Sequence, residues 1–347
     1  MGLGRKDLNM KKDYQALFIC FIIMLIIPIF LHGRSDILHI LIMCFLWSVV
    51  VVGWDLIIGY AGIFSFGQIA FFTIGAYGSG MLTKYLGISP WVGILAGGAI
   101  ACAVGILIGI PSLRLAGIYV ALLTFAFHEA LISLIIVGRP IGTGGSTSIT
   151  GIPPLGIGGY IFPVINRVPW YYIAGCLAFL SYFVTLKIIR SSYGLSFVAL
   201  RDAEDYAMSL GINDYKSKLT VFALSALFAG IAGGFYAHYS RLVSIRILGL
   251  DNFVLLLVML IVGGLGKFPG AVISTFIFFF INEYLRSLQV YRPIILGAIV
   301  IVAIIFMPQG IGGSLDYIGS GLKDLIEKIG FGRMLERLKP RQKDLEK

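Results

Sequence analysis

Apolar runs about twenty residues long recur along almost the whole chain. Of its 347 residues, 58% are hydrophobic and 13% are charged, and the mean hydropathy is +0.94. Soluble domains carry about 25% charged residues. Roughly 20 apolar residues in a helix are long enough to cross a bilayer, where each backbone amide must be satisfied within its own segment. The pattern predicts an all-α polytopic membrane protein.

The apolar runs divide into about ten helices, with eight to ten as the expected range, because the eighth is short and merges with the ninth. Residues 37–138 and 219–308 are candidates for two related halves of opposite orientation. Glycines break the second helix from the third and the eighth from the ninth, namely Gly59, Gly62, Gly67, Gly263, Gly264, Gly266 and Gly270. The predicted helices are 16–32, 37–58, 62–83, 91–110, 115–138, 170–189, 219–239, 251–264, 268–286 and 292–308.

Lysine and arginine predict the orientation of these helices. Most of the 27 Lys and Arg residues fall in segments on the same side as residues 1–15, and cytoplasmic segments carry the positive excess. The transmembrane domain 16–312 therefore has a cytoplasmic loop at 191–218 and an external loop at 138–169. A cytoplasmic amphipathic tail follows at 313–347. The net charge of +10 then belongs to the inner face and anionic lipid, and predicts no nucleic-acid partner.

The longest polar segment between apolar runs is Ser191–Leu219. Ser196 is a candidate helix N-cap and Gly211 a candidate helix end. Between them Ala203, Ala207 and Leu210 share one face at spacings of three and four. A helix with this small-residue face fits the groove of a partner protein, and an ordinary solvated loop helix is the alternative interpretation.

Few ionisable residues lie within the predicted helices. Asp55 is near the inner end of the second and is expected to reach water, whereas His128 and Glu129 are adjacent in the fifth. That pair suggests either a proton relay or a structural hydrogen bond. The four cysteines stand singly, no metal-spaced or Ser-His-Asp cluster is present, and the segment 263–268 lacks the pattern of a P-loop. The chain is therefore predicted to be no enzyme, and ATP-driven transport would need a separate ATPase chain.

Six segments together resemble the permease subunits of branched-chain amino acid ABC transporters, and in particular the second, longer permease of the pair. The resemblance runs from about Leu56 to Gly312 and has the order and spacing of that family. Its segments are GYAGIFSFGQIAFFTIGAY (59–77), PSLRLAGIYVALLTFAFHE (111–129), TGIP (150–153), the segment 191–236, VMLIVGGLGKFPGAV (258–272) and FMPQGIGG (306–313).

The resemblance implies an importer permease bundle in the inner (plasma) membrane. Its implied partners are a homologous second permease, two cytoplasmic ATPase subunits that bind ATP and Mg, and a periplasmic or lipid-anchored binding protein. It also implies that residues 196–211 form the coupling helix, which docks into an ATPase. The residues that match the family's coupling pattern, in which the E-A-A signature is degenerate here, are Ser196, Arg201, Glu204, Ala207 and Gly211.

The sequence indicates the family more specifically than it indicates the substrate. Gln68 stands where many members have His, and related permeases carry urea, short amides or other amino acids. Gln68, Thr124 and Glu129 are the candidate path residues. A proton-coupled secondary transporter using Asp55 or Glu129 is the main rival. A membrane enzyme or scaffold using His128 and Glu129 is a second rival. A channel is disfavoured because no ring-forming selectivity segment is evident.

Overall fold

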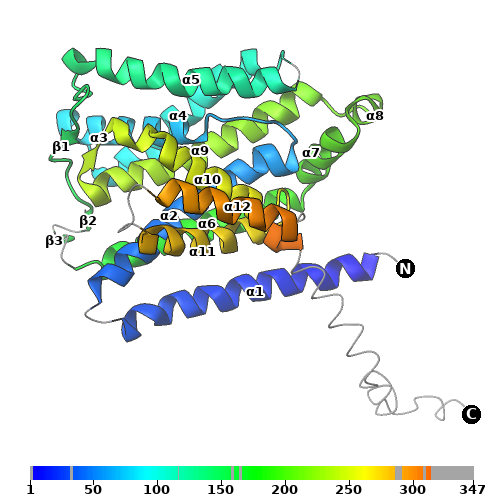
Figure 1. Ribbon diagram of the computed structural model, residues 1–347, viewed down its shortest axis with the longest axis horizontal. Helices are drawn as coiled ribbons and strands as arrows, with labels where there is room; N and C mark the ends of the chain where they lie inside the picture. Colours follow the sequence, from blue (N-terminus) through cyan, green and yellow to red (C-terminus); the bar gives the residue numbers. More distant parts are fainter. Residues whose placement is uncertain are drawn as a thin grey trace, which may run out of the picture.

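A computed structural model describes residues 3–31, 34–115, 117–157, 160–163, 166–285, 291–307 and 310–313. Most helices run along the long axis of the molecule (Figure 1). The elements, in chain order, are α1 (Leu3–Phe30), α2 (Ser35–Asp55), the π-helical turn η1 (Leu56–Tyr60), α3 (Gln68–Leu86), α4 (Pro90–Ser112), α5 (Ile118–Val137), the 3₁₀ turn η2 (Arg139–Ile141), β1 (Ile149–Thr150), β2 (Gly156–Ile157), β3 (Tyr160–Ile161), α6 (Val168–Ile189), α7 (Ser192–Asp202), α8 (Glu204–Ser209), α9 (Asp214–Ser240), β4 (Leu242–Val243), the 3₁₀ turn η3 (Ile245–Leu248), α10 (Leu250–Gly263), α11 (Gly270–Tyr284) and α12 (Arg292–Phe306).

Five of these helices are long and apolar enough to cross a membrane: α2 with η1, α4, α5, α6 and α9. Three shorter apolar helices accompany them, at Leu17–Phe30, Leu250–Gly263 and Gly270–Tyr284. The strands in the described part of the chain form only two-residue pairs, β1 with β4 and β2 with β3. The prediction of a helical, multi-pass membrane protein is confirmed.

Glycine and other small residues hold the centre of the bundle together. On α4 they recur at every fourth position, at Gly93, Gly97, Ala101, Gly105 and Gly109, and all are buried. This stripe faces α3 and α9, which pack most closely against α4. A Cβ atom built on α3 at Gly75 would overlap the backbone of Gly230 on α9. Such close backbone approach replaces the hydrophobic effect as the means of helix association in lipid.

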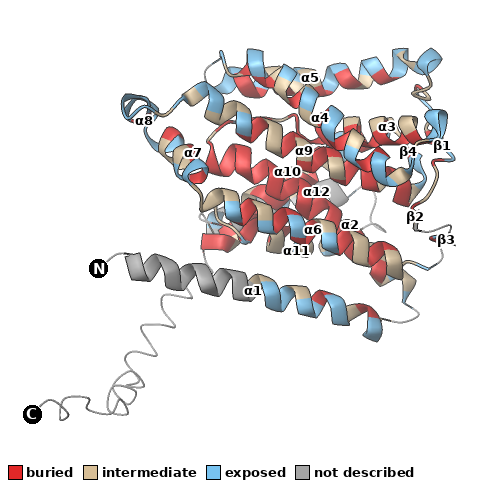
Figure 2. Cartoon of the chain, turned by 180° about the vertical axis from the view of Figure 1, so that it is seen from behind, coloured by how far each residue is buried: buried red, intermediate tan, exposed pale blue. Residues whose placement is uncertain are grey.

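Burial separates the central helices from the peripheral ones. Buried residues gather on α2, α3, α9 and α10, whereas long exposed faces run along α1 and α5 (Figure 2). On α5 one narrow face, which includes Val120, Thr124 and Leu131, is buried and the rest points away from the bundle. The exposed apolar faces are those expected of helices in contact with lipid or with another membrane chain.

The two ends of the molecule differ. The helices α7 and α8 lie at one end of the long axis, and β1, β2 and β3 lie at the other (Figure 1). The predicted loops 191–218 and 138–169 thus lie at opposite ends. The segment 138–169 is held by contacts, since Ile149 pairs with Val243, Trp91 donates to the Gly156 carbonyl at 2.8 Å and Ile152 is fully buried.

Several predicted boundaries were wrong. Residues 61–67 are not helical, so the third helix begins at Gln68 and not at 62. The apolar residues Ile63, Phe64 and Phe66 look helical in sequence, but Gly62 has a positive φ of +70° that ends the preceding turn. The first helix begins at Leu3, well before 16. The predicted tail from residue 314 onward lies outside the described residues.

The predicted helix 196–211 is two helices. It breaks at Ala203, where φ is −156° and ψ is 78°. Ser196 is not an N-cap, because it lies inside α7 and its hydroxyl donates to the Ser192 carbonyl at 2.9 Å. Gly211 follows α8 with φ +87°, and the amide of Ile212 bonds back to the Ala207 carbonyl at 3.2 Å. This pairing across a left-handed glycine is a common helix ending.

Candidate functional site

Two glycine breaks meet at the end of the bundle that carries α7. The first follows α2, where η1 contains Gly59 and the chain then runs without helix to Gly67. The second separates α10 from α11, and Gly264 and Gly266 there have φ of +93° and +68°. Positive φ strains side-chain-bearing residues, so glycine is required at these positions. Single π-helical turns are frequent at functional sites.

The carboxylate of Asp55 joins the two breaks. Its Oδ1 accepts a hydrogen bond from the Gly266 amide at 2.8 Å. Asp55 is 3% exposed, so the expectation that it simply reaches water was wrong. A Cβ atom built on Gly59 would overlap both Asp55 Oδ1 and the Gly266 amide nitrogen. The contact therefore depends on glycine at position 59.

Arg201, near the end of α7, reaches into the same junction. Its guanidinium donates to the Gly59 carbonyl at 2.6 Å and its Nε donates to Asp202 at 2.8 Å. Its aliphatic stem covers Gly62, where an added Cβ would lie 3.2 Å from the Arg201 Cβ. We call Asp55, Gly59, Arg201 and Gly266 the coupling junction. It connects α7 to both helix breaks through charged hydrogen bonds, which are stronger than neutral ones.

A polar cavity of about 440 Å³ lies beside the coupling junction. Residues from the first break, the α4–α5 turn, α7, α8 and the start of α9 line it, among them Arg114, Arg201, Glu204 and Lys218. Lys218 bridges Glu204 at 2.8 Å and Asp214 at 2.7 Å. These ion pairs fix α8 to the first turn of α9. The predicted coupling residue Glu204 therefore forms an ion pair within this chain.

The face predicted for docking is exposed only in part. Ala207 is 3% exposed, so its methyl group packs within this chain and is unavailable to a partner. Leu210, which the prediction placed on the same face, points outward with 79% exposure, and Tyr206 beside it is 76% exposed. Ala203, at the break between α7 and α8, is exposed as well, so Ala207 is the one residue of the predicted face that is withdrawn from the surface. An exposed apolar face at the end of a membrane protein is a typical docking surface.

Two of the three candidate path residues are buried near the start of α3, and the third is exposed. Gln68 is buried, accepts from Ser225 Oγ at 2.9 Å and donates to the Val50 carbonyl at 3.2 Å, which links α2, α3 and α9. Thr124 is buried and its hydroxyl accepts from the Phe66 amide at 2.9 Å, which ties α5 to the first break. Glu129 lies on the exposed face of α5. Gln68 and Thr124 therefore have bonding partners inside the protein.

His128 has the surroundings of a structural residue. Its Nε2 lies 3.0 Å from the Leu248 carbonyl, so this nitrogen must carry the proton. Glu129 is 3.9 Å away, which is too long for a hydrogen bond. The ring stacks on Phe125 and contacts Phe253. This geometry favours the structural interpretation over a relay.

Sequence reasoning missed the role of His238. This buried side chain bonds Ser79 through Nε2 at 2.9 Å and the Pro153 carbonyl through Nδ1 at 2.7 Å. It thereby anchors the segment 138–169 to α3 and α9. Its place two residues before the end of an apolar helix was the only sequence signal, and it is a weak one. Among the described residues, no group of three or more His, Cys, Asp or Glu side chains is arranged to hold a metal ion.

Comparisons with known proteins agree with the resemblance read from the motifs. The family described as "Branched-chain amino acid transport system / permease component" matches residues 36–306. The chain is 28% identical over 319 residues to the high-affinity branched-chain amino acid transport system permease protein LivM of Escherichia coli, which covers 86% of this chain and 75% of that protein. The Salmonella typhimurium LivM is 28% identical over 303 residues, covering 81% and 71%.

No solved structure matches the chain significantly. The family match nevertheless spans both helix breaks, α7 and α8, and every long apolar helix described above. The expectation drawn from the motifs is therefore confirmed at the level of the family. The chain belongs to the family of permease components of branched-chain amino acid transport systems.

Proposed function

We propose that this chain is a permease subunit of an ATP-driven importer, and that it carries branched-chain or related amino acids delivered by an external binding protein. Two separate ATPase chains bind ATP and Mg²⁺ on the cytoplasmic side, where α7 and α8 lie, and both termini face that side. The observation that carries the proposal is the hydrogen bond from Arg201 on α7 to the Gly59 carbonyl in the first break. The two relatives are named as branched-chain amino acid permeases, which supports the substrate class.

The coupling junction gives the proposal a mechanism. Closure of the ATPase pair displaces α7 and α8, and Arg201 moves with them. Its bond to Gly59 passes the displacement to the first break, and the Asp55–Gly266 bond passes it to the second. Glycines with positive φ give both breaks backbone conformations that regular helix lacks. The bundle then changes between inward-facing and outward-facing states as connected rigid bodies.

The first test targets the α8 face with a matched pair of substitutions. Leu210 and Ile141 are isomeric side chains with 79% and 77% exposure at opposite ends of the molecule. Leu210→Arg is expected to abolish recovery of ATPase subunits when the tagged permease is purified from native membranes in mild detergent. Charge and bulk on an apolar contact face oppose docking. Ile141→Arg should leave recovery unchanged.

Two outcomes would contradict the proposal. Wild-type permease that brings down no ATPase removes the ATP-driven mechanism, and Leu210→Arg permease that still brings down ATPase removes α8 as the docking face. Leucine uptake by the same membranes distinguishes the substrate. If urea or short amides inhibit leucine uptake and other branched-chain amino acids do not, the chain carries the alternative substrates.

A second permease is expected to cover the exposed face of α5. Glu129 lies in the middle of this helix and its side chain is 54% exposed. A carboxylate facing lipid at such depth costs about 2.5–3.5 kcal/mol or more. A homologous permease packed on α5 would remove that cost and leave the carboxylate at the interface between the two chains, where a shared path can run.

Glu129→Ala is therefore expected to lower leucine uptake by roughly tenfold, the effect of about 1.4 kcal/mol, without reducing insertion of the chain. Initial uptake rates in membranes containing the complete transporter measure this. Leu122→Ala is the control, because Leu122 is an apolar residue on the exposed face of the same helix. Equal rates for wild type and Glu129→Ala would remove Glu129 from the path.

A further inference from the structure

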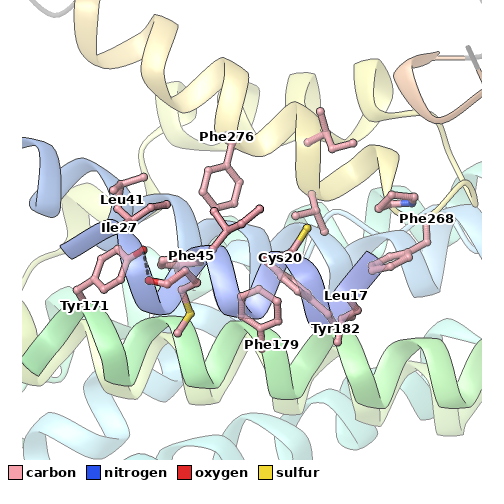
Figure 3. Close-up of a pocket in the computed structure, with 15 residues that line it drawn as sticks. Leu17, Cys20, Ile27, Leu41, Phe45, Tyr171, Phe179, Tyr182, Phe268 and Phe276 are labelled. Atoms are coloured by element: carbon pink, nitrogen blue, oxygen red, sulfur yellow. Dashed lines mark hydrogen bonds between the residues drawn. The ribbon is translucent and has the colours of Figure 1, made fainter. Parts of the chain in front are cut away.

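A cavity of about 320 Å³ lies between α1 and the rest of the bundle, and it shares no lining residue with the polar cavity beside the coupling junction. Side chains from α1, α2, α6 and α11 and from the turn before α11 line it. Figure 3 shows the α1 residues Leu17 and Cys20 facing it, with Phe45 of α2, Phe179 of α6 and Phe276 of α11 around them. Its volume falls in the range of small-molecule sites.

The cavity offers almost nothing to a polar ligand. The two tyrosine hydroxyls in its wall are already engaged. Tyr171 donates to the Met24 carbonyl at 3.1 Å, seen as the dashed line in Figure 3, and Tyr182 bonds Ser48. The other lining residues are aliphatic, aromatic, proline or the thiol of Cys20. An amino acid, whose charged groups must be paired when buried, does not fit such a wall.

The position of α1 explains how the cavity forms. This helix is fixed along α6, where Met24 packs on Gly175 and Phe21 meets Phe179 edge to face at 5.2 Å. The side of α1 toward α11 is separated from the bundle by the cavity. The opposite side exposes Phe18, Ile19 and other large apolar residues. The cavity therefore lies directly behind a helix whose outer face contacts the hydrocarbon of the bilayer.

We propose that the cavity between α1, α2, α6 and α11 binds one acyl chain of a membrane phospholipid. An empty apolar space deprives the side chains around it of van der Waals contacts, and contacts of this kind are what hold helices together in lipid. A bilayer around the bundle would supply acyl chains at very high local concentration. The bound acyl chain packs against the side of α1 that does not contact α6. It thereby completes the attachment of α1 to the bundle.

Photo-crosslinking tests the site directly. The full chain, in vesicles of phosphatidylethanolamine and phosphatidylglycerol, receives trace phosphatidylglycerol with a diazirine in the middle of one acyl chain. Crosslinks are expected on Met24, Leu41 and Phe45, which are 3%, 9% and 5% exposed and out of reach of bulk lipid. Crosslinks confined to exposed side chains such as Phe18 and Ile19 would overturn the proposal.

A matched pair on α11 provides the control. Ile273 lines the cavity, whereas Ile277, one turn later, is 44% exposed and does not. Ile273→Trp fills the cavity and is expected to lower the crosslinks at Met24 by roughly tenfold, as overpacking of a site does. Ile277→Trp should leave them unchanged. If Ile273→Trp fails to insert, the smaller change Val272→Phe at the same wall replaces it. Unchanged crosslinks in the cavity-filling variant contradict the proposal.

A protein segment is the alternative occupant. A benzophenone attached to Cys20, in a chain whose other three cysteines are alanine, reports which molecule enters the cavity in native membranes. Cys20 is itself exposed, so the supporting result is crosslinking to phospholipid that Ile273→Trp lowers and Ile277→Trp does not. Crosslinking to residues 314–347 or to a second membrane protein overturns it.

Discussion

Arg201→Ala is expected to reduce leucine uptake by roughly 10- to 100-fold while ATPase subunits still copurify with the permease. The substitution removes the guanidinium that donates to the Gly59 carbonyl at 2.6 Å. A hydrogen bond from a charged group contributes about 1.5–3 kcal/mol, and 1.4 kcal/mol is a factor of ten. The α8 face proposed to dock the ATPase is untouched, so binding and transport should separate. Initial uptake rates and pull-down from the same membranes measure the two effects.

Two further variants make this test specific. Lys187→Ala removes an exposed cation from the end of α6, at the same end of the molecule, and should leave uptake near the wild-type rate. Arg201→Lys keeps the charge but lacks the planar fork, so partial uptake is expected. Loss of uptake in Lys187→Ala as large as in Arg201→Ala would show that charge at this end matters and that the junction does not.

Gly75→Ala is expected to destabilise the bundle by about 2 kcal/mol or more, since inserting a methyl group into a packed contact typically costs about 1–3 kcal/mol. Its Cβ would overlap the backbone of Gly230, and backbone cannot move aside as a side-chain end can. The contact joins α3 to α9 at the centre of the bundle. Thermal unfolding in detergent, followed by the loss of the monodisperse peak in size-exclusion chromatography, measures the change.

Gly78→Ala on the same helix is the matched control. There the nearest atom to an added Cβ is Cδ1 of Ile100 at 3.2 Å, the far end of a flexible side chain. This variant should unfold within a few degrees of wild type. If both variants unfold at the wild-type temperature, α3 and α9 are not held by the backbone contact described above.

The sequence predicted the long helices well and the turns poorly. The prediction 170–189 compares with Val168–Ile189, and 91–110 with Pro90–Ser112, because length and apolarity alone decide whether a segment spans a bilayer. The residues 62–67 are just as apolar yet are not helical. Their conformation is set by Gly62 and by the Thr124 hydroxyl that binds the Phe66 amide, and a partner on a distant helix leaves no trace in the local sequence.

The candidate site, too, was predicted only in part. The glycines of both breaks were predicted, since glycine clusters interrupt helices visibly. The contact between the two breaks was not predicted, because Asp55 and the Gly266 amide are far apart in the chain. Likewise, residues 196–211 have the composition of one helix, but Arg201 and Lys218 form contacts elsewhere that favour a break at Ala203. Tertiary contacts outweigh local propensity here.

The bonds of the coupling junction end on main-chain atoms, the carbonyl of Gly59 and the amide of Gly266. Every residue presents a main-chain carbonyl and every residue except proline an amide N–H, so the proposed transmission depends on two side chains, Asp55 and Arg201, and on two glycines. Side chains elsewhere that preserve the packing of the bundle can then differ without breaking these two bonds. Under the proposed mechanism, substrate selection and energy transmission rest on different residues, and α7 with α8 should be exchangeable between permeases of different substrates.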